Sequence, residues 1–116
     1  QLMQDRAGKV GFDWDDISGV LTKVAEEVAE IEMAQDTDEK ARELGDLLFS
    51  LVNLARWLGI HAEDALRQAN LRFKERYLMM EALAGQDNLD FHDLPLDKKE
   101  KLWGKAKRLR LQEELD

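Results

Sequence analysis

Apolar residues recur every three to four positions along most of the chain, which is the spacing of an amphipathic α-helix. The pattern predicts four helices, at about Asp15 to Gln35, Asp36 or Thr37 to Leu58, His61 to Leu83, and from Leu96 onward. We expect Asp13 to cap the first helix, Gly59 to end the second and Gly85 to end the third. No segment alternates with the period of two that is typical of a strand, so the predicted fold class is all-α.

The second predicted helix is apolar around more than half of its circumference, because Phe49, Val52 and Trp57 add to its main stripe. The main stripe consists of Leu44, Leu47, Leu48, Leu51, Leu54, Ala55 and Leu58. Four helices in 116 residues bury little surface. We therefore expect a four-helix bundle completed by a second subunit, as a homodimer or a dimer of dimers. The alternative is a monomer whose fourth helix covers the extra face.

Length and composition limit the classes of function. A chain of 116 residues is expected to form one domain, residues 1–116. Its 17 basic and 25 acidic residues leave a net charge of −8, which argues against binding nucleic acid. The absence of cysteine, with only two histidines, excludes disulfides, cysteine nucleophiles and Cys/His zinc sites. No apolar run follows a basic segment at the start and no stretch suits a membrane, so we expect a cytoplasmic protein.

Two short acidic motifs carry the candidate chemistry: Glu26-Glu27-Val28-Ala29-Glu30 and Glu43-Leu44-Gly45-Asp46. Within each motif two acids are three residues apart and so share one helix face. The short connection between the helices makes them antiparallel, which can bring Glu27, Glu30, Glu43 and Asp46 together. Such a cluster repels itself unless it is partly protonated or binds hard divalent ions, and two Mg²⁺ would balance four carboxylates. Mn²⁺ is an expected substitute.

The competing interpretation of these acids is a solvated helix face. Two features count against it: Gly45 lies in mid-helix at a cost of about 1 kcal/mol, which suggests close approach of another backbone or a ligand. Asp46 lies beside the apolar stripe, so we expect it off the outer face. Glu26 either borders the cluster or faces solvent. A di-iron centre is excluded, because the chain has no Glu-x-x-His pair.

The third and fourth helices offer cations that suit a triphosphate. Arg72 and Arg76 lie four residues apart, after Asn70, and Lys107 follows Trp103 by the same interval on a basic helix. A tryptophan at such a position either packs in the core or stacks on a base. The same choice applies near the N-terminus, where the segment around Phe12 and Trp14 either staples the first helix or lies over a base.

The acidic motifs, separated by twelve residues, resemble the signature of the MazG-like all-α nucleoside triphosphate pyrophosphohydrolases. The resemblance extends to Val10-Gly11-Phe12-Asp13-Trp14, to Gly45-Asp46-Leu47-Leu48-Phe49 with Val52-Asn53-Leu54-Ala55-Arg56, to the segment from Ala65 to Arg76, and to Leu102-Trp103 with Lys107. It therefore covers nearly the whole chain. The chain is most similar to the C-terminal half of two-domain MazG proteins.

The resemblance implies an enzyme that hydrolyses a nucleoside triphosphate between the α and β phosphates, giving a monophosphate and pyrophosphate. It implies Mg²⁺ ligands at Glu27, Glu30, Glu43 and Asp46, and nucleotide contacts at Arg72, Arg76, Trp103 and Lys107. Many relatives have Lys at the position of Arg72. The general base is Glu26 or a ligating carboxylate such as Glu27, and further substrate contacts are expected at Asn53, Asn70 and Trp14.

Several functions share this pattern. The main expectation is a housecleaning enzyme of broad or noncanonical-base specificity. The alternatives are a narrow dUTP, dCTP or phosphoribosyl-ATP pyrophosphohydrolase, a non-catalytic regulatory or assembly domain, and a purely structural helical dimer.

Overall fold

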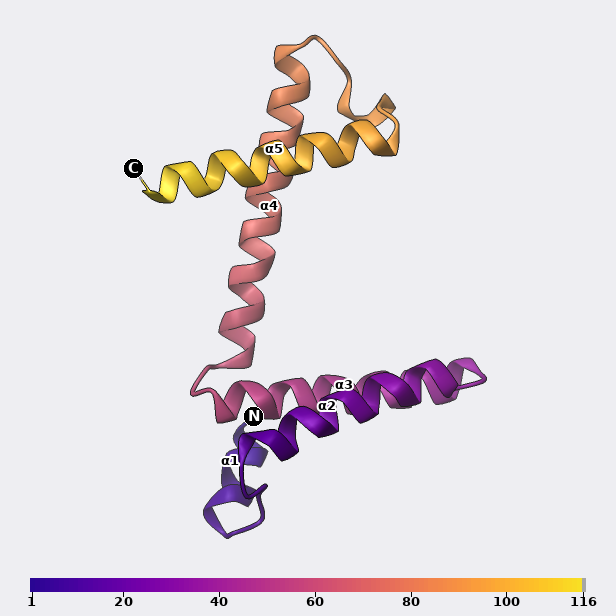
Figure 1. The fold of residues 1–116 in the computed structure, drawn as a ribbon, viewed down its shortest axis with the longest axis vertical. Helices are drawn as coiled ribbons and strands as arrows, with labels where there is room; N and C mark the ends of the chain where they lie inside the picture. Colours follow the sequence, from indigo (N-terminus) through magenta and orange to yellow (C-terminus); the bar gives the residue numbers. More distant parts are fainter. Residues whose placement is uncertain (116) are drawn as a thin grey trace. The chain divides into compact units, whose positions relative to one another are not determined.

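The computed structural model describes residues 1–115, with side chains placed as far as Gln112, and these residues form helices without any strand (Figure 1). The elements are α1 (Leu2–Lys9), α2 (Ile17–Met33), α3 (Thr37–Trp57), α4 (Ala62–Gln86), the 3-10 turn η1 (Phe91–Asp93) and α5 (Leu96–Leu115). The all-α prediction is confirmed. The prediction of four helices is wrong, because the described residues form one more α-helix, α1, before the four that were predicted. The chain forms two compact units that meet within α4, between Leu66 and Arg67.

The first unit contains α1, α2, α3 and the start of α4. Helices α2 and α3 lie side by side as an antiparallel pair joined by three residues (Figure 1). Both begin with an aspartate cap: Asp16 Oδ1 accepts hydrogen bonds from the backbone of Ser18 and Gly19, and Asp36 Oδ1 accepts one from the backbone of Glu39. The prediction that Asp13 caps the first long helix is therefore wrong. Gly59 ends α3 as predicted, with a left-handed φ of +73°.

Helix α1 is fastened to the rest of the first unit by glutamine side chains. Gln1 Nε2 donates to the carbonyl of Ile60 at 2.8 Å, and Gln1 Oε1 accepts from the backbone of Ala62 at 2.9 Å. Gln4 Nε2 donates to the carbonyl of Phe49 at 3.0 Å. Because α1 spans only eight residues and is held by polar contacts, its apolar periodicity is too short to predict it.

In the second unit α4 and α5 pack through aromatic and small side chains. The rings of Phe73 and Trp103 lie 5.6 Å apart, and Tyr77 meets Phe91 of η1 edge to face at 5.5 Å. The buried apolar residues are Met80, Leu83, Ala84 and Ala106. Helix α4 continues through Gly85 to Gln86, so the expectation that Gly85 ends it is wrong.

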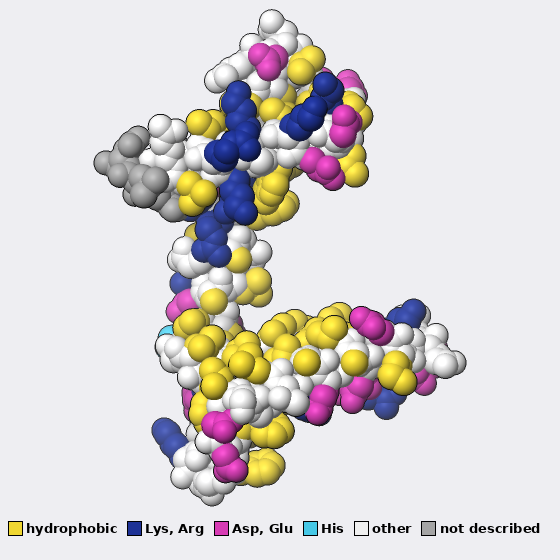
Figure 2. Space-filling model, in the orientation of Figure 1, with side chains coloured by type: hydrophobic (Ala, Val, Ile, Leu, Met, Phe, Trp, Pro, Cys, Tyr) yellow, Lys and Arg dark blue, Asp and Glu magenta, His cyan; other side chains and the backbone are white. Residues whose placement is uncertain are grey.

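Much of the apolar surface of α3 is exposed in the single chain, although the sequence pattern places it on a buried side. Leu44, Leu48, Leu51 and Phe49 are 41% to 62% exposed. Figure 2 shows hydrophobic side chains gathered along the surface of the α2 and α3 pair. Across the described residues, every helix is too short or too polar to cross a lipid bilayer.

Candidate metal centre and nucleotide site

Three glutamates from two helices meet on the antiparallel pair. Glu27 and Glu30 of α2 and Glu43 of α3 each place one carboxylate oxygen within 4.8 Å of the others. The spacing of three residues puts the first two on one face of α2, and the packing of α3 brings the third beside them. Glu27 is buried, Glu43 is half-buried and Glu30 is exposed.

The electrostatics of the cluster reflect unbalanced negative charge. Lys23 Nζ lies 2.8 Å from Glu27 Oε1, and this hydrogen bond lowers the pKa of Glu27. Hydrogen bonding to Glu43 and Glu27, together with their charge, raises the pKa of Glu30 to about 7. Glu30 is therefore partly protonated near neutral pH, as expected from the repulsion among the carboxylates.

The carboxylates of Glu27, Glu30 and Glu43 form a site that suits a hard divalent cation. The Oε2 atoms of Glu27 and Glu43 are buried, and no N–H or O–H group of the described residues donates a hydrogen bond to them. Burying an unpaired carboxylate oxygen is unfavourable, and a cation removes the penalty. Carboxylate oxygens are the ligands that Mg²⁺ and Mn²⁺ take in proteins.

Other residues expected at this centre lie differently. Asp46 is exposed and is not among the oxygens within 4.8 Å of one another, so the expectation that it faces away from solvent is wrong for the single chain. Glu26 is exposed at the border of the cluster, 3.8 Å from Lys23 Nζ. A Cβ on Gly45 would meet no atom of the chain within 4 Å, so no backbone of this chain approaches it.

The second unit brings together two of the residues predicted to contact nucleotide. The guanidinium of Arg76 lies 5.2 Å from the centre of the Trp103 ring, and its Nε is buried without a hydrogen-bond partner. Trp103 is half-buried against Phe73, so it is both a packing residue and the support of Arg76. Arg72, Lys107 and Asn70 are exposed on the same two helices.

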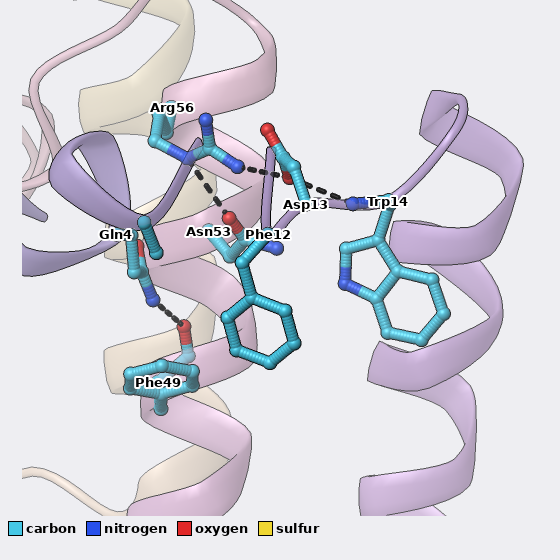
Figure 3. Close-up of a pocket in the computed structure, with 8 residues that line it drawn as sticks. Gln4, Phe12, Asp13, Trp14, Phe49, Asn53 and Arg56 are labelled. Carbon is cyan, nitrogen blue, oxygen red and sulfur yellow. Dashed lines mark hydrogen bonds and ion pairs between the residues drawn. The ribbon is translucent and has the colours of Figure 1, made fainter. Parts of the chain in front are cut away.

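The first unit also contains a pocket of about 450 Å³ beside the N-terminal loop (Figure 3). It includes Trp14 and Asn53, both expected to contact substrate. Its other lining residues are Gln4, Ala7, Phe12, Asp13, Phe49 and Arg56. Gln4, Phe49 and Arg56 were not expected at a site from the sequence pattern. The only signal for Arg56 was its place in the segment that resembles MazG.

Asp13 organises one end of this pocket. Its Oδ1 lies 2.5 Å from a guanidinium nitrogen of Arg56, and it also accepts from Trp14 N at 2.8 Å and Trp57 Nε1 at 3.3 Å. The Arg56 hydrogen bond lowers the pKa of Asp13, which stays ionised. The loop that carries Trp14 is thereby tied to α3. The Trp14 indole in turn packs on Gly19, where an added Cβ would lie 2.9 Å from Cε3.

A smaller cavity of about 100 Å³ shares part of the lining of this pocket. Trp14, Phe49 and Asn53 line both cavities, and the smaller one also reaches Lys23. Since Lys23 binds Glu27, one lysine connects the aromatic pocket with the carboxylate cluster.

The fold and the site define an all-α protein with a carboxylate centre on α2 and α3 that suits a divalent cation, and with an aromatic pocket lined by α1, the loop after it and α3. Residues 16–79, more than half of the chain, match the MazG nucleotide pyrophosphohydrolase domain. The chain belongs to this family.

Two relatives illustrate the similarity. The chain is 47% identical over 105 residues to the nucleoside triphosphate pyrophosphohydrolase/pyrophosphatase MazG of Thermotoga maritima, a match that covers 90% of this chain and 41% of the relative. It is 40% identical over 113 residues to the nucleoside triphosphate pyrophosphohydrolase of Escherichia coli K12, covering 93% of this chain and 43% of the relative. The chain thus spans about two fifths of the length of the curated relatives it matches.

Proposed function

We propose that the chain hydrolyses nucleoside triphosphates between the α and β phosphates, with Mg²⁺ as cofactor, to a nucleoside monophosphate and pyrophosphate. The proposed substrate range is broad, as suits a housecleaning enzyme. The proposed partner is a free nucleotide rather than a nucleic acid, which agrees with the net charge of −8. The proposed location is the cytoplasm.

The observation that carries the proposal is the meeting of Glu27, Glu30 and Glu43 in a MazG domain, with two buried oxygens that have no partner. Asp46, one turn after Glu43, is the proposed fourth ligand. A bound divalent cation would supply positive charge for the phosphates and for the pyrophosphate leaving group. With such a cation bound, the ion pair between Lys23 and Glu27 would no longer be needed to balance the charge of Glu27.

The chemical step needs an attacking water and an acceptor for its proton. The water oxygen forms a bond to the α phosphorus while the bond to the bridging oxygen breaks, and pyrophosphate leaves with that oxygen. We propose Glu26 or Glu27 as the group that accepts the proton. Glu26 borders the cluster and is exposed, whereas Glu27 is buried and bound to Lys23.

Cations on the second unit are proposed to bind the nucleotide. Arg76 is pre-positioned by its contact with Trp103, and Arg72 lies one turn before it on α4. Trp103, Lys107 and Asn70 are the other contacts proposed on this unit. Arginine at position 72 can bind phosphate oxygens with two parallel hydrogen bonds.

A second copy of the chain is proposed to cover the exposed leucines of α3, as a homodimer or a dimer of dimers. Leu44, Leu48 and Leu51 recur at helical spacing and are each 41% to 55% exposed. A stripe of this kind is typical of a helix that packs on a partner.

The test is release of pyrophosphate from a panel of ordinary and damaged nucleoside triphosphates, with Mg²⁺ and with EDTA. Hydrolysis in water enriched in heavy oxygen should place the label in the monophosphate. Glu27→Gln should abolish turnover, whereas Glu32→Gln, which removes an exposed acid of the same helix, should not. Turnover of one base alone would favour the narrow dUTP, dCTP or phosphoribosyl-ATP enzymes. A folded chain that hydrolyses none would favour a regulatory or assembly domain.

A further inference from the structure

The pocket of about 450 Å³ combines exposed aromatic walls with a buried polar atom that has no partner. Phe12, Trp14 and Phe49 line it and are 82%, 46% and 62% exposed. Large aromatic side chains at this level of exposure offer flat surfaces for a planar ligand to stack on. Figure 3 shows Phe12 and Trp14, from the loop between α1 and α2, together with the lining residues Phe49 and Asn53 of α3.

The polarity of Gln4 is set by its neighbour. Its Nε2 donates to the carbonyl oxygen of Phe49 at 3.0 Å, and only the nitrogen of the amide can do so. The remaining atom, Oε1, is therefore an acceptor. It is buried and receives no hydrogen bond from the described residues, and Gln4 as a whole residue is only 8% exposed. A buried acceptor of this kind is satisfied by a ligand that brings an N–H group.

The polarity of Asn53 is set in the same way. Its Oδ1 accepts from Arg56 Nε at 3.0 Å, which leaves its Nδ2 as the group available to donate. Asn53 is 8% exposed and lines the same pocket. Arg56 is itself held by Asp13, so the orientation of Asn53 is supported by an ion pair.

We propose that this pocket holds the base of the nucleoside triphosphate, and that Gln4 Oε1 accepts a hydrogen bond from an N–H on the pairing edge of the base. The inference rests on the proposed function and adds a specificity-determining residue to it. Every ordinary base carries such an N–H, so one acceptor of this type admits them all. A base without an N–H leaves Gln4 unpaired and is disfavoured.

Uridine triphosphate and its N3-methyl derivative test the inference, because N3–H is the only N–H of the uracil ring. For the unaltered chain we expect the methyl group to lower kcat/KM by about tenfold or more. In Gln4→Met both substrates should give the same kcat/KM, because the acceptor is gone. The matched variant Gln68→Met, at an exposed glutamine of α4, should keep the full discrimination.

The comparison of two substrates separates recognition from stability. If Gln4 served only to fasten α1 to Phe49, Gln4→Met would lower both values together and leave their ratio unchanged, and this result would overturn the inference. Equal values for the two substrates in the unaltered chain would also overturn it. Phe12→Ala, which truncates a mostly exposed side chain, provides a variant with little risk to folding and should raise KM for every base by about tenfold.

Binding of nucleotides that cannot be hydrolysed tests the base pocket separately from the pyrophosphohydrolase activity. The probes are α,β-methylene-UTP and its N3-methyl derivative, measured by calorimetry with Mg²⁺. Tighter binding of the first, with no hydrolysis of any triphosphate, would support the pocket and refute the pyrophosphohydrolase. Hydrolysis of triphosphates with equal binding of the two probes would refute the pocket and retain the enzyme.

Discussion

Gly19→Ala is a sharp probe of the aromatic pocket. An added Cβ would lie 2.9 Å from Cε3 of Trp14, whereas ordinary contacts begin at 3.4 Å. The indole must therefore move by at least 0.5 Å, the difference between these two distances. Trp14 is 46% exposed and lies on a loop, so it can move without opening a core.

The effect on stability should be small. Alanine in place of glycine in a helix stabilises the folded state by up to about 1 kcal/mol, and the displaced contact with Trp14 offsets part of this gain. We expect the free energy of unfolding in urea to change by less than about 1 kcal/mol. Gly85→Ala is the matched control, because Gly85 is also helical and its added Cβ would meet nothing within 4 Å.

The effect on substrate binding should be larger. Stacking of a base on an aromatic side chain is worth about 1–3 kcal/mol, and losing half of it would raise KM by about two- to tenfold. The affinity for Mg²⁺ should not change, because Glu27, Glu30 and Glu43 line neither of the two cavities to which Trp14 contributes. Fluorine NMR of fluorotryptophan-labelled protein, with the Trp14 signal assigned from Trp14→Phe, reports the movement directly.

Two results would refute this reasoning. An unshifted Trp14 signal in Gly19→Ala would show that the indole does not pack on Gly19 in solution. A shifted signal with unchanged KM for all triphosphates would show that Trp14 is not part of the base site.

Three further predictions concern the carboxylates and the apolar face. In EDTA, the free energy of unfolding measured by urea titration should fall as the pH rises from about 4.5 to about 7. The reason is that the pKa of Glu30 is raised from 4.5 to about 7, so between these values only the folded state keeps the proton. Glu30→Gln should remove this fall. Mg²⁺ at one hundred times its Kd should raise the free energy of unfolding by about 2.7 kcal/mol, and Glu27→Gln should abolish the increase. Leu48→Asp should convert the proposed dimer into a monomer in sedimentation experiments, because it places a charge in the apolar face.

Controls and contrary outcomes differ among these predictions. Glu32→Gln should leave both the pH dependence and the Mg²⁺ effect intact, since it removes an equal charge outside the cluster. A pH dependence that persists in Glu30→Gln would assign it to another group. Leu89→Asp alters a leucine of similar exposure that is not part of α3, and if it dissociates the protein as Leu48→Asp does, the effect is not specific to the α3 face.

The residue that caps the N-terminus of α2 could not be identified from the sequence alone. Asp13, Asp15 and Asp16 all precede α2, and any of them has the side chain of an N-cap. Asp16 takes the role because its own backbone is extended there, while Asp13 is engaged by Arg56, 43 residues away. The sequence around Asp13 gives no indication that Arg56 will be its partner in the folded chain.

The long helices and the three-residue spacing of their glutamates were determined by the sequence alone, because helical periodicity and side-chain spacing are local properties. The meeting of Glu27, Glu30 and Glu43 at the candidate metal centre follows from those properties together with the short connection between α2 and α3. Only the tertiary structure revealed the N-terminal helix α1, the contacts of Gln4 and Asp13, and the exposure of Asp46. Each of these depends on which surface another helix covers, and that is set by packing between residues far apart in the chain.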